Sequence, residues 1–468
     1  MNREKELVKN TIILGLGRFL PKLVSVITLP IVTACLTKNE YGTYDLITTL
    51  VSLLLPVATL QVQSAAFRFL IECRGDHNKS TEIITNIYAV VFPISCIVSA
   101  LVIFFIKNLS LSVKIVTVAY FFLDSIQTTQ GMVVRGLGKN KVYSINAIIL
   151  SVVNGLCIVL CLKLKNQGLF GIVFSLALAN LLSVLFLCVN TRIWEFLDIK
   201  RMSKTKIQEL ISYSWPMVPN NLSTWILKLS DRFVITAFLG LEANAVYAVA
   251  NKIPNLLSIA QSVLIMAWQE NASIAVNDKD ASVYYTKMFD RIFTLMIGCT
   301  AVLIGFTPVM FKLLIRGDYS ESYVQMPLLI LGMFFCAISS FQGGIYIAHK
   351  RTKSIGYTTI IAAIVNIFLD LLLIRWMGIT AGSISTLVAY LVLYILRMIG
   401  TKKFQPVDYK IKKQLLCYSL IIFMLFICFL RNYYLNILNA IFGFSIFFII
   451  NTDFLKMIFN KTKSLVKK

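Results

Sequence analysis

Charged side chains recur within long apolar segments of this sequence, where a charge needs water or a partner. Arg18 and Lys22 are four residues apart in the apolar segment 11–36, so they lie on one face of a helix. Neither has an acidic residue three or four positions away on that helix. Because a charge facing lipid costs about 3 kcal/mol or more, we expect both cations to face water. There they would bind an anionic group such as a pyrophosphate through charge-assisted hydrogen bonds.

Polar residues also follow stripes at helical spacing in other apolar segments, which predicts a water-filled central cavity. We assign its cationic lining to Arg18, Lys22, Lys228, Lys252 and Arg68, and its other polar lining to Asp45, Asp124, Gln127, Asn221, Thr224, Asp231, Asn251 and Gln342. Simpler interpretations stay open for some of them. Lys228 and Asp231 are three residues apart and can neutralise one another. Arg68 and Asp45 lie close enough to a membrane surface for their polar ends to reach it.

The composition is that of a membrane protein. Of the 468 residues, 57% are hydrophobic and only 14% are charged, which is too apolar a mixture for one soluble core. Apolar runs of about 20 residues, each long enough to span a bilayer, recur along the chain. The start, MNREKELVKN, lacks the short apolar region and small-residue cleavage site of a signal peptide. We therefore expect the first helix to stay in the protein.

Hydropathy predicts an all-α membrane protein with about fourteen transmembrane helices. The expected spans are residues 11–36, 43–68, 81–106, 112–136, 142–164, 168–190, 210–238, 243–269, 287–314, 323–348, 355–375, 379–399, 414–430 and 434–451. A shift of about 203 residues aligns 34–46 with 237–249, which indicates an internal repeat. We expect two six-helix lobes around the cavity, at 1–200 and 201–402. Two further helices and a tail would follow at 403–468.

Basic residues gather in short clusters between the predicted spans, including 192–206, 350–353 and 461–468. By the positive-inside rule these clusters face the cytoplasm. We therefore expect a multi-pass protein of the bacterial cytoplasmic membrane with both termini inside. The same distribution accounts for the formal net charge of +23, so we expect no nucleic-acid partner.

The sequence also lacks the usual motifs for enzymatic chemistry. It contains no phosphate-binding loop for a nucleotide, no CxxC pair and only two histidines, His77 and His349. We expect no catalytic residue, metal or cofactor. A membrane-embedded glycosyltransferase, polymerase or ligase would be expected to carry carboxylates or histidines on a large outer loop, whereas the predicted outer turns are short. A purely structural scaffold would not need polar stripes in six helices.

Two stretches resemble a known family. Residues 213–257 read YSWPMVPNNLSTWILKLSDRFVITAFLGLEANAVYAVANKIPNLL, and they are similar to the start of the second half of Wzx-type O-antigen and polysaccharide flippases. The matching elements are Ser214, Pro216, Pro219, Asn220, Trp225, Ser230, Asp231, Arg232, Tyr247, Ala250, Lys252 and Ile253. Residues 29–46, LPIVTACLTKNEYGTYDL, and the Phe-Arg-Phe at 67–69 resemble that family's first two helices.

The resemblance implies the fold of the multidrug/oligosaccharidyl-lipid/polysaccharide (MOP) exporters. It implies a flippase that carries an undecaprenyl-pyrophosphate-linked oligosaccharide from the inner to the outer leaflet by alternating access, for O-antigen, capsule or exopolysaccharide. Membrane lipid, a coupling H+ or Na+ and a polysaccharide polymerase complex are its expected partners. In the related lipid II flippases the first helices and the eighth place cations in the cavity, a description that Arg18, Lys22, Arg68 and Lys252 match. A cation-coupled multidrug antiporter of the same fold and a lipid II-type flippase remain alternatives.

Overall fold

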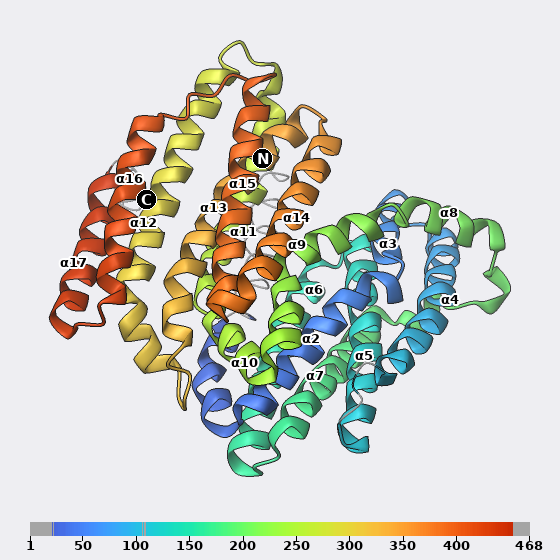
Figure 1. The fold of residues 1–468 in the computed structure, drawn as a ribbon. Helices are drawn as coiled ribbons and strands as arrows, with labels where there is room; N and C mark the ends of the chain where they lie inside the picture. The colour runs from blue at the N-terminus through green and yellow to red at the C-terminus, as the bar shows by residue number, and fades with distance from the viewer. Residues whose placement is uncertain (1–20, 22, 105, 107–108, 453–468) are drawn as a thin grey trace, which may run out of the picture. The chain divides into compact units, whose positions relative to one another are not determined.

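The computed structural model describes residues 21, 23–104, 106 and 109–452, and within these ranges the chain is helical, with no β-strand (Figure 1). Two compact units divide the chain, Met1–Ile226 and Leu227–Lys468. The division falls within helix α9 (Met217–Leu239). The boundaries expected at 200/201 and 402/403 stay a prediction.

The first unit packs around α3, α4 and α5. Its helices are an apolar helix at Leu23–Cys35, then α2 (Lys38–Ala58), α3 (Val62–Glu72), α4 (His77–Leu101), α5 (Leu111–Gly136), α6 (Asn140–Ile158), α7 (Gly168–Thr191) and α8 (Lys204–Ser214). Side chains such as Ala66, Ile84 and Val133 form its buried core, and α8 packs against α3 and α4. A Cβ on Gly136 would lie 2.7 Å from the Leu70 Cβ, so α5 approaches α3 closely only because residue 136 has no side chain.

Two of the spans expected to be continuous are each broken into two helices. Between α2 and α3, Leu60 and Gln61 have positive φ values of 46° and 55°, a conformation that costs non-glycine residues of order 1–3 kcal/mol each. The span expected at 243–269 is divided into α10 (Leu241–Ala250) and α11 (Pro254–Ile274), with a turn at 251–253. Pro254 begins α11 because proline fits the first turn of a helix and cannot continue one.

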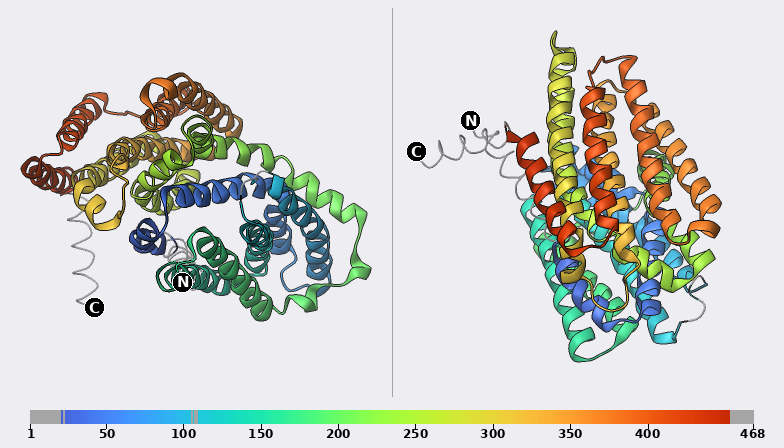
Figure 2. Two further views of the ribbon diagram at one scale, coloured as in Figure 1. Left: turned by 60° about the horizontal axis from the view of Figure 1, so that its bottom comes forward. Right: turned by 60° about the vertical axis from the view of Figure 1, so that its left-hand side comes forward.

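The second unit is built around α13. Besides the rest of α9, α10 and α11, its helices are α12 (Ala281–Leu314), α13 (Ser322–Ala348), α14 (Thr352–Met377), α15 (Thr380–Lys402), α16 (Ile411–Phe429) and α17 (Tyr433–Ile450). Helix α13 packs against α11, α12 and α15, while α16 and α17 lie beside α12 (Figures 1 and 2). The Trp268 ring stacks on Phe341 with centroids 4.2 Å apart, and its Nε1 donates to the Phe341 carbonyl at 2.8 Å. These contacts fix α11 on α13.

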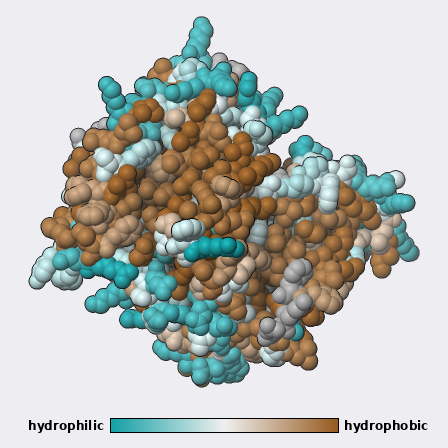
Figure 3. Space-filling view, viewed as in Figure 1, coloured by the Kyte–Doolittle hydropathy of each residue, from teal (hydrophilic) through white to brown (hydrophobic). Residues whose placement is uncertain are grey.

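Within the described residues, ten helices are long and apolar enough to cross a membrane, namely α2, α4, α6, α7 and α12–α17. The span of α4 extends to Phe104 and that of α6 to Leu164. Helices α5, α9 and α11 coincide with further expected spans but carry more polar residues. On the face of the second unit shown in Figure 3, apolar residues cover the middle of the helices and hydrophilic ones gather at their ends. This pattern is that of a multi-pass membrane protein.

Candidate cation site

Three helices of the second unit bring polar side chains together in its interior. Helix α9 supplies Asp231, helix α14 supplies Asn366 and Asp370, and helix α15 supplies Ser385 and Thr386. Asn366 and Asp370 are four residues apart and therefore share one face of α14. All five are buried, and Asn366, Asp370 and Ser385 have no exposed surface at all.

The Asp231 carboxylate is held by two hydroxyl groups. Its Oδ2 accepts hydrogen bonds from Tyr247 Oη at 2.6 Å and from Thr386 Oγ1 at 2.5 Å. Tyr247 Oη also lies 3.3 Å from the carbonyl oxygen of Gly382. A Cβ on Gly382 would lie 3.1 Å from the Tyr247 ring, so the glycine leaves room for the tyrosine to reach Asp231.

The Asp370 carboxylate is held by a second, connected set of hydrogen bonds. Ser385 Oγ donates to Asp370 Oδ1, and Asn366 Nδ2 lies 3.4 Å from the same hydroxyl. The Asn366 Oδ1 accepts from Ser230 Oγ at 3.1 Å. The network therefore joins α9, α14 and α15 through side chains alone.

The two carboxyl groups belong to this one buried network and lie close enough to interact electrostatically. Each keeps one buried oxygen, Asp231 Oδ1 and Asp370 Oδ2, that accepts no hydrogen bond from any residue in the described part of the chain. Two adjacent buried carboxylates repel, so they cannot both be ionised without a positive charge between them. The arrangement therefore requires a bound proton or a metal cation.

The available donors are all oxygen atoms, from two carboxylates, an amide and hydroxyl groups. Hard cations prefer such oxygen ligands, whereas transition metals prefer histidine nitrogen or cysteine sulfur. No group of three or more His, Cys, Asp or Glu side chains that could hold a metal occurs among the described residues. The oxygen donors therefore suit a proton or a hard metal cation, and Asp231, Asp370, Asn366 and Thr386 are the residues placed to hold it.

The residues expected to form the cationic lining of the cavity differ in exposure and in partners. Arg18 and Lys22 lie outside the described residues. Lys228 is exposed on α9, whereas Asp231 is buried, and among the described residues the two do not form the ion pair that their spacing allows. Lys252 is half-buried in the turn between α10 and α11. Arg68 pairs with Glu72 at 2.8 Å, with both side chains more than half exposed.

The expected polar lining is likewise distributed over several helices. Asp45 is buried on α2, while Asp124 and Gln127 on α5 and Thr224 on α9 are half-buried. Asn221 and Asn251 each donate at 3.0 Å to a backbone carbonyl four residues earlier. Gln342 is fully buried on α13, and its amide bonds the backbone of α15. In the orientation that satisfies both ends, the amide nitrogen donates to the Tyr394 carbonyl oxygen and the amide oxygen accepts from the Met398 N–H, each at 3.2 Å.

Sequence reasoning found Asp231 but missed its partner Asp370 and the residues around them. A signal was available: Asn366 and Asp370 are four residues apart in the otherwise apolar stretch AAIVNIFLDLLLI. Asp290, another carboxylate within a helix of membrane length, α12, is already neutralised. It accepts from Lys410 at 2.9 Å and from Lys413 at 2.6 Å.

Comparisons with known proteins agree with this architecture. The family model described as polysaccharide biosynthesis protein matches residues 7–270. Among solved structures, the lipid II flippase MurJ in an inward closed conformation is similar, with TM-score 0.71 and 16% identity, over 97% of this chain and 100% of that one. An inward-facing multidrug resistance MATE family transporter of the MOP superfamily has TM-score 0.67 and 12% identity, over 83% of this chain and 93% of that one. A comparison with curated protein sequences finds no match.

These likenesses confirm the expected fold class, an all-helical membrane protein with the fold of MurJ and the MATE transporters. The family match confirms the resemblance at the level of polysaccharide biosynthesis proteins, and the solved structures confirm it at the level of the fold.

Proposed function

Because this chain belongs to the polysaccharide biosynthesis protein family, we propose that it is a flippase for a lipid-linked oligosaccharide. The cargo would be an undecaprenyl-pyrophosphate-linked repeat unit for O-antigen, capsule or exopolysaccharide, as in Wzx-type flippases. The protein would turn it from the inner to the outer leaflet of the cytoplasmic membrane by alternating access, with both termini in the cytoplasm. A polysaccharide polymerase complex would then receive it.

The observation that carries this proposal is the buried carboxylate pair Asp231–Asp370. Two carboxylates within helices that cross a membrane destabilise the fold unless a cation joins them. A transporter gains from this arrangement, because cation binding and release then shift the balance between two conformations. A scaffold or a transferase has no comparable use for it. We therefore propose that H+ or Na+ binds here and drives the movement of cargo.

The cargo itself is anionic at its pyrophosphate. Arg18, Lys22, Arg68, Lys228 and Lys252 remain the cations that we propose to contact it, since arginine and lysine bind phosphate oxygens through charge-assisted hydrogen bonds. Asp45, Asp124, Gln127, Asn221, Thr224, Asn251 and Gln342 stay the proposed polar lining. The Arg68–Glu72 ion pair is exposed and weak, so it does not prevent Arg68 from binding a phosphate instead.

The decisive experiment follows lipid-linked oligosaccharide in cells that lack this gene. We expect the intermediate to accumulate on the cytoplasmic leaflet and surface polysaccharide to be lost. The wild-type gene should restore both, whereas an Asp231→Asn variant and an Arg18→Gln/Lys22→Gln double variant, expressed at equal levels, should not. Full activity of the double variant would contradict the assignment of the cargo cations.

Two alternatives are supported by specific likenesses. The fold shared with a multidrug resistance transporter, together with the carboxylate pair, also fits a cation-coupled drug antiporter. The fold shared with MurJ fits a lipid II flippase. Normal polysaccharide with raised drug sensitivity in the deletion strain would favour the first, and accumulation of peptidoglycan precursors would favour the second.

A further inference from the structure

Helices α12 and α17 lie in close backbone contact at two glycines, Gly305 and Gly443. A Cβ on Gly305 would lie 2.8 Å from the Asn439 carbonyl oxygen, and a Cβ on Gly443 would lie 2.6 Å from that of Ala301. The two backbones can approach this closely only where side chains are missing. Pro308 follows in α12, where it cannot donate to the carbonyl four residues earlier and so favours a bend.

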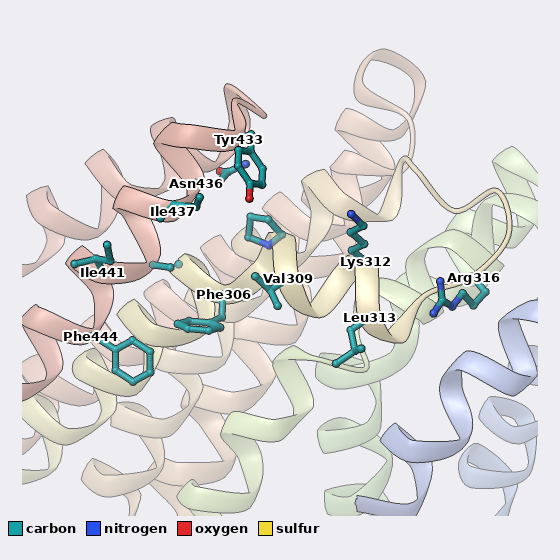
Figure 4. Close-up of a pocket in the computed structure, with 13 residues that line it drawn as sticks. Phe306, Val309, Lys312, Leu313, Arg316, Tyr433, Asn436, Ile437, Ile441 and Phe444 are labelled. Carbon is teal, nitrogen blue, oxygen red and sulfur yellow. The ribbon is translucent and has the colours of Figure 1, made fainter.

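From this contact toward the α12 C-terminus, a groove of about 780 Å³ opens between the two helices. Figure 4 shows its apolar walls, which are Phe306, Val309 and Leu313 on α12 and Ile437, Ile441 and Phe444 on α17. Most of these side chains are exposed, as expected on a face that meets hydrocarbon. Only 17% of the α17 span is buried within the protein.

Polar groups lie at one end of the groove only. Lys312 is exposed there, about 10 Å along the helix axis from Gly305, and Arg316 lies just beyond the end of α12 (Figure 4). Tyr433 and Tyr434, both more than 70% exposed, mark the same level at the start of α17. Exposed tyrosines and basic residues at a helix end are typical of the boundary between headgroups and hydrocarbon.

We propose that this groove is a binding site for an anionic phospholipid of the membrane. One acyl chain would lie along the apolar walls toward Gly305, and Lys312 would contact the headgroup phosphate. The charge is complementary, because a lipid phosphate is an anion and lysine binds phosphate as a point charge. We assign the contact to Lys312 because Arg316 has an acidic residue, Asp318, two positions away. This site goes beyond the proposed transport and does not depend on it.

Other occupants fit less well. A second copy of the chain would need a face of about 20–30 residues, whereas thirteen residues at the ends of two helices line the groove. The chain beyond residue 452 starts at the opposite end of α17, about 27 Å from Tyr433 along an 18-residue helix.

The test is native mass spectrometry of the full chain, purified in detergent and titrated with phosphatidylglycerol or phosphatidylethanolamine. We expect one saturable phosphatidylglycerol site and weaker binding of the zwitterionic lipid. Lys312→Gln should weaken phosphatidylglycerol binding about fivefold, the effect of one lysine at an anionic membrane surface. Lys163→Gln, at the end of another span, is the charge-matched control and should bind as the wild type does.

A second pair of variants tests the groove rather than the charge. Ile437→Trp fills the groove and should abolish the saturable site, whereas Leu438→Trp, on an exposed position of α17 outside the lining, should keep it. Equal binding of the two lipids, or unchanged binding by both Lys312→Gln and Ile437→Trp, would overturn the proposal. So would saturation of the groove by a second copy of the chain, seen as a dimer that Ile437→Trp dissociates.

Discussion

Replacing Asp370 by asparagine removes one of two buried negative charges that a coupling cation would join. A cation about 4 Å from a carboxylate is attracted by about 4 kcal/mol at an effective dielectric constant of 20. That energy corresponds to about a thousandfold in a binding constant. Asparagine keeps the size and one oxygen of the side chain, so Ser385 can still donate to it. We therefore expect the fold to persist while cation affinity falls by about a thousandfold.

Thermal unfolding in detergent measures this effect directly. A cation at one hundred times its Kd stabilises the wild type by about 2.7 kcal/mol. With about 2.1 cal/mol/K per residue over 468 residues, the Tm should rise by about 3 °C. For Asp370→Asn the same concentration is about a tenth of the Kd, so the rise should disappear. Asp290→Asn is the matched control, because Asp290 is already paired with Lys410 and Lys413 and its loss should leave the cation-induced rise intact.

The outcomes separate the possible cations. A Tm that rises with Na+ at constant ionic strength identifies sodium, and one that responds to pH but not to Na+ identifies a proton. If the wild-type Tm responds to neither, or if Asp370→Asn keeps the full rise, the carboxylate pair does not bind the coupling cation.

Three further substitutions test a close helix contact, a helix cap and a half-buried histidine. Gly344→Ala should destabilise the second unit by about 1–3 kcal/mol, because a Cβ there would lie 2.6 Å from the Trp268 ring. A lower Tm with quenched or shifted tryptophan fluorescence would show this effect. An unchanged Tm would contradict the close packing. Thr37→Ala should lower the free energy of unfolding by about 1 kcal/mol, since Thr37 and Glu40 form a capping box at the start of α2. Thr37→Ser should retain most of the stability. Equal unfolding of the two variants would argue against the cap. His349→Gln should reduce the loss of stability on acidification. Burial lowers the pKa of His349, so the unfolded chain binds the proton more readily than the folded chain, and stability falls as the pH drops below about 6.5. An identical pH profile of stability for the variant and the wild type would refute this.

The arrangement of spans was predictable because it depends on local composition. Runs of apolar residues of membrane length decide where helices form, whatever they pack against. The break at Leu60 and Gln61 was not predictable in the same way, because neither residue favours a left-handed conformation. The break at 251–253 had a local signal in Pro254.

The candidate cation site shows the limit of spacing arguments. Asp231 was identified from a polar stripe on one helix, but its partner Asp370 lies 139 positions later on another. Only the packing of α9, α14 and α15 brings the two carboxylates together. The packing of α13 against α15 likewise determines the role of Gln342, since its amide bonds the backbone of α15. A stripe shows that a helix face is polar, whereas its neighbours decide whether water, a ligand or another helix satisfies it.

The glycine contact between α12 and α17 also has a consequence for synthesis. Gly443 leaves the ribosome about 140 residues after Gly305, which at roughly 5–20 residues per second is about 7–28 s later. During that interval the α12 face around Gly305 has entered the membrane without the helix that will cover it. Newly made chains would therefore expose this glycine face to lipid or to the insertion machinery until α17 arrives. Truncation before α17 should make that exposure permanent.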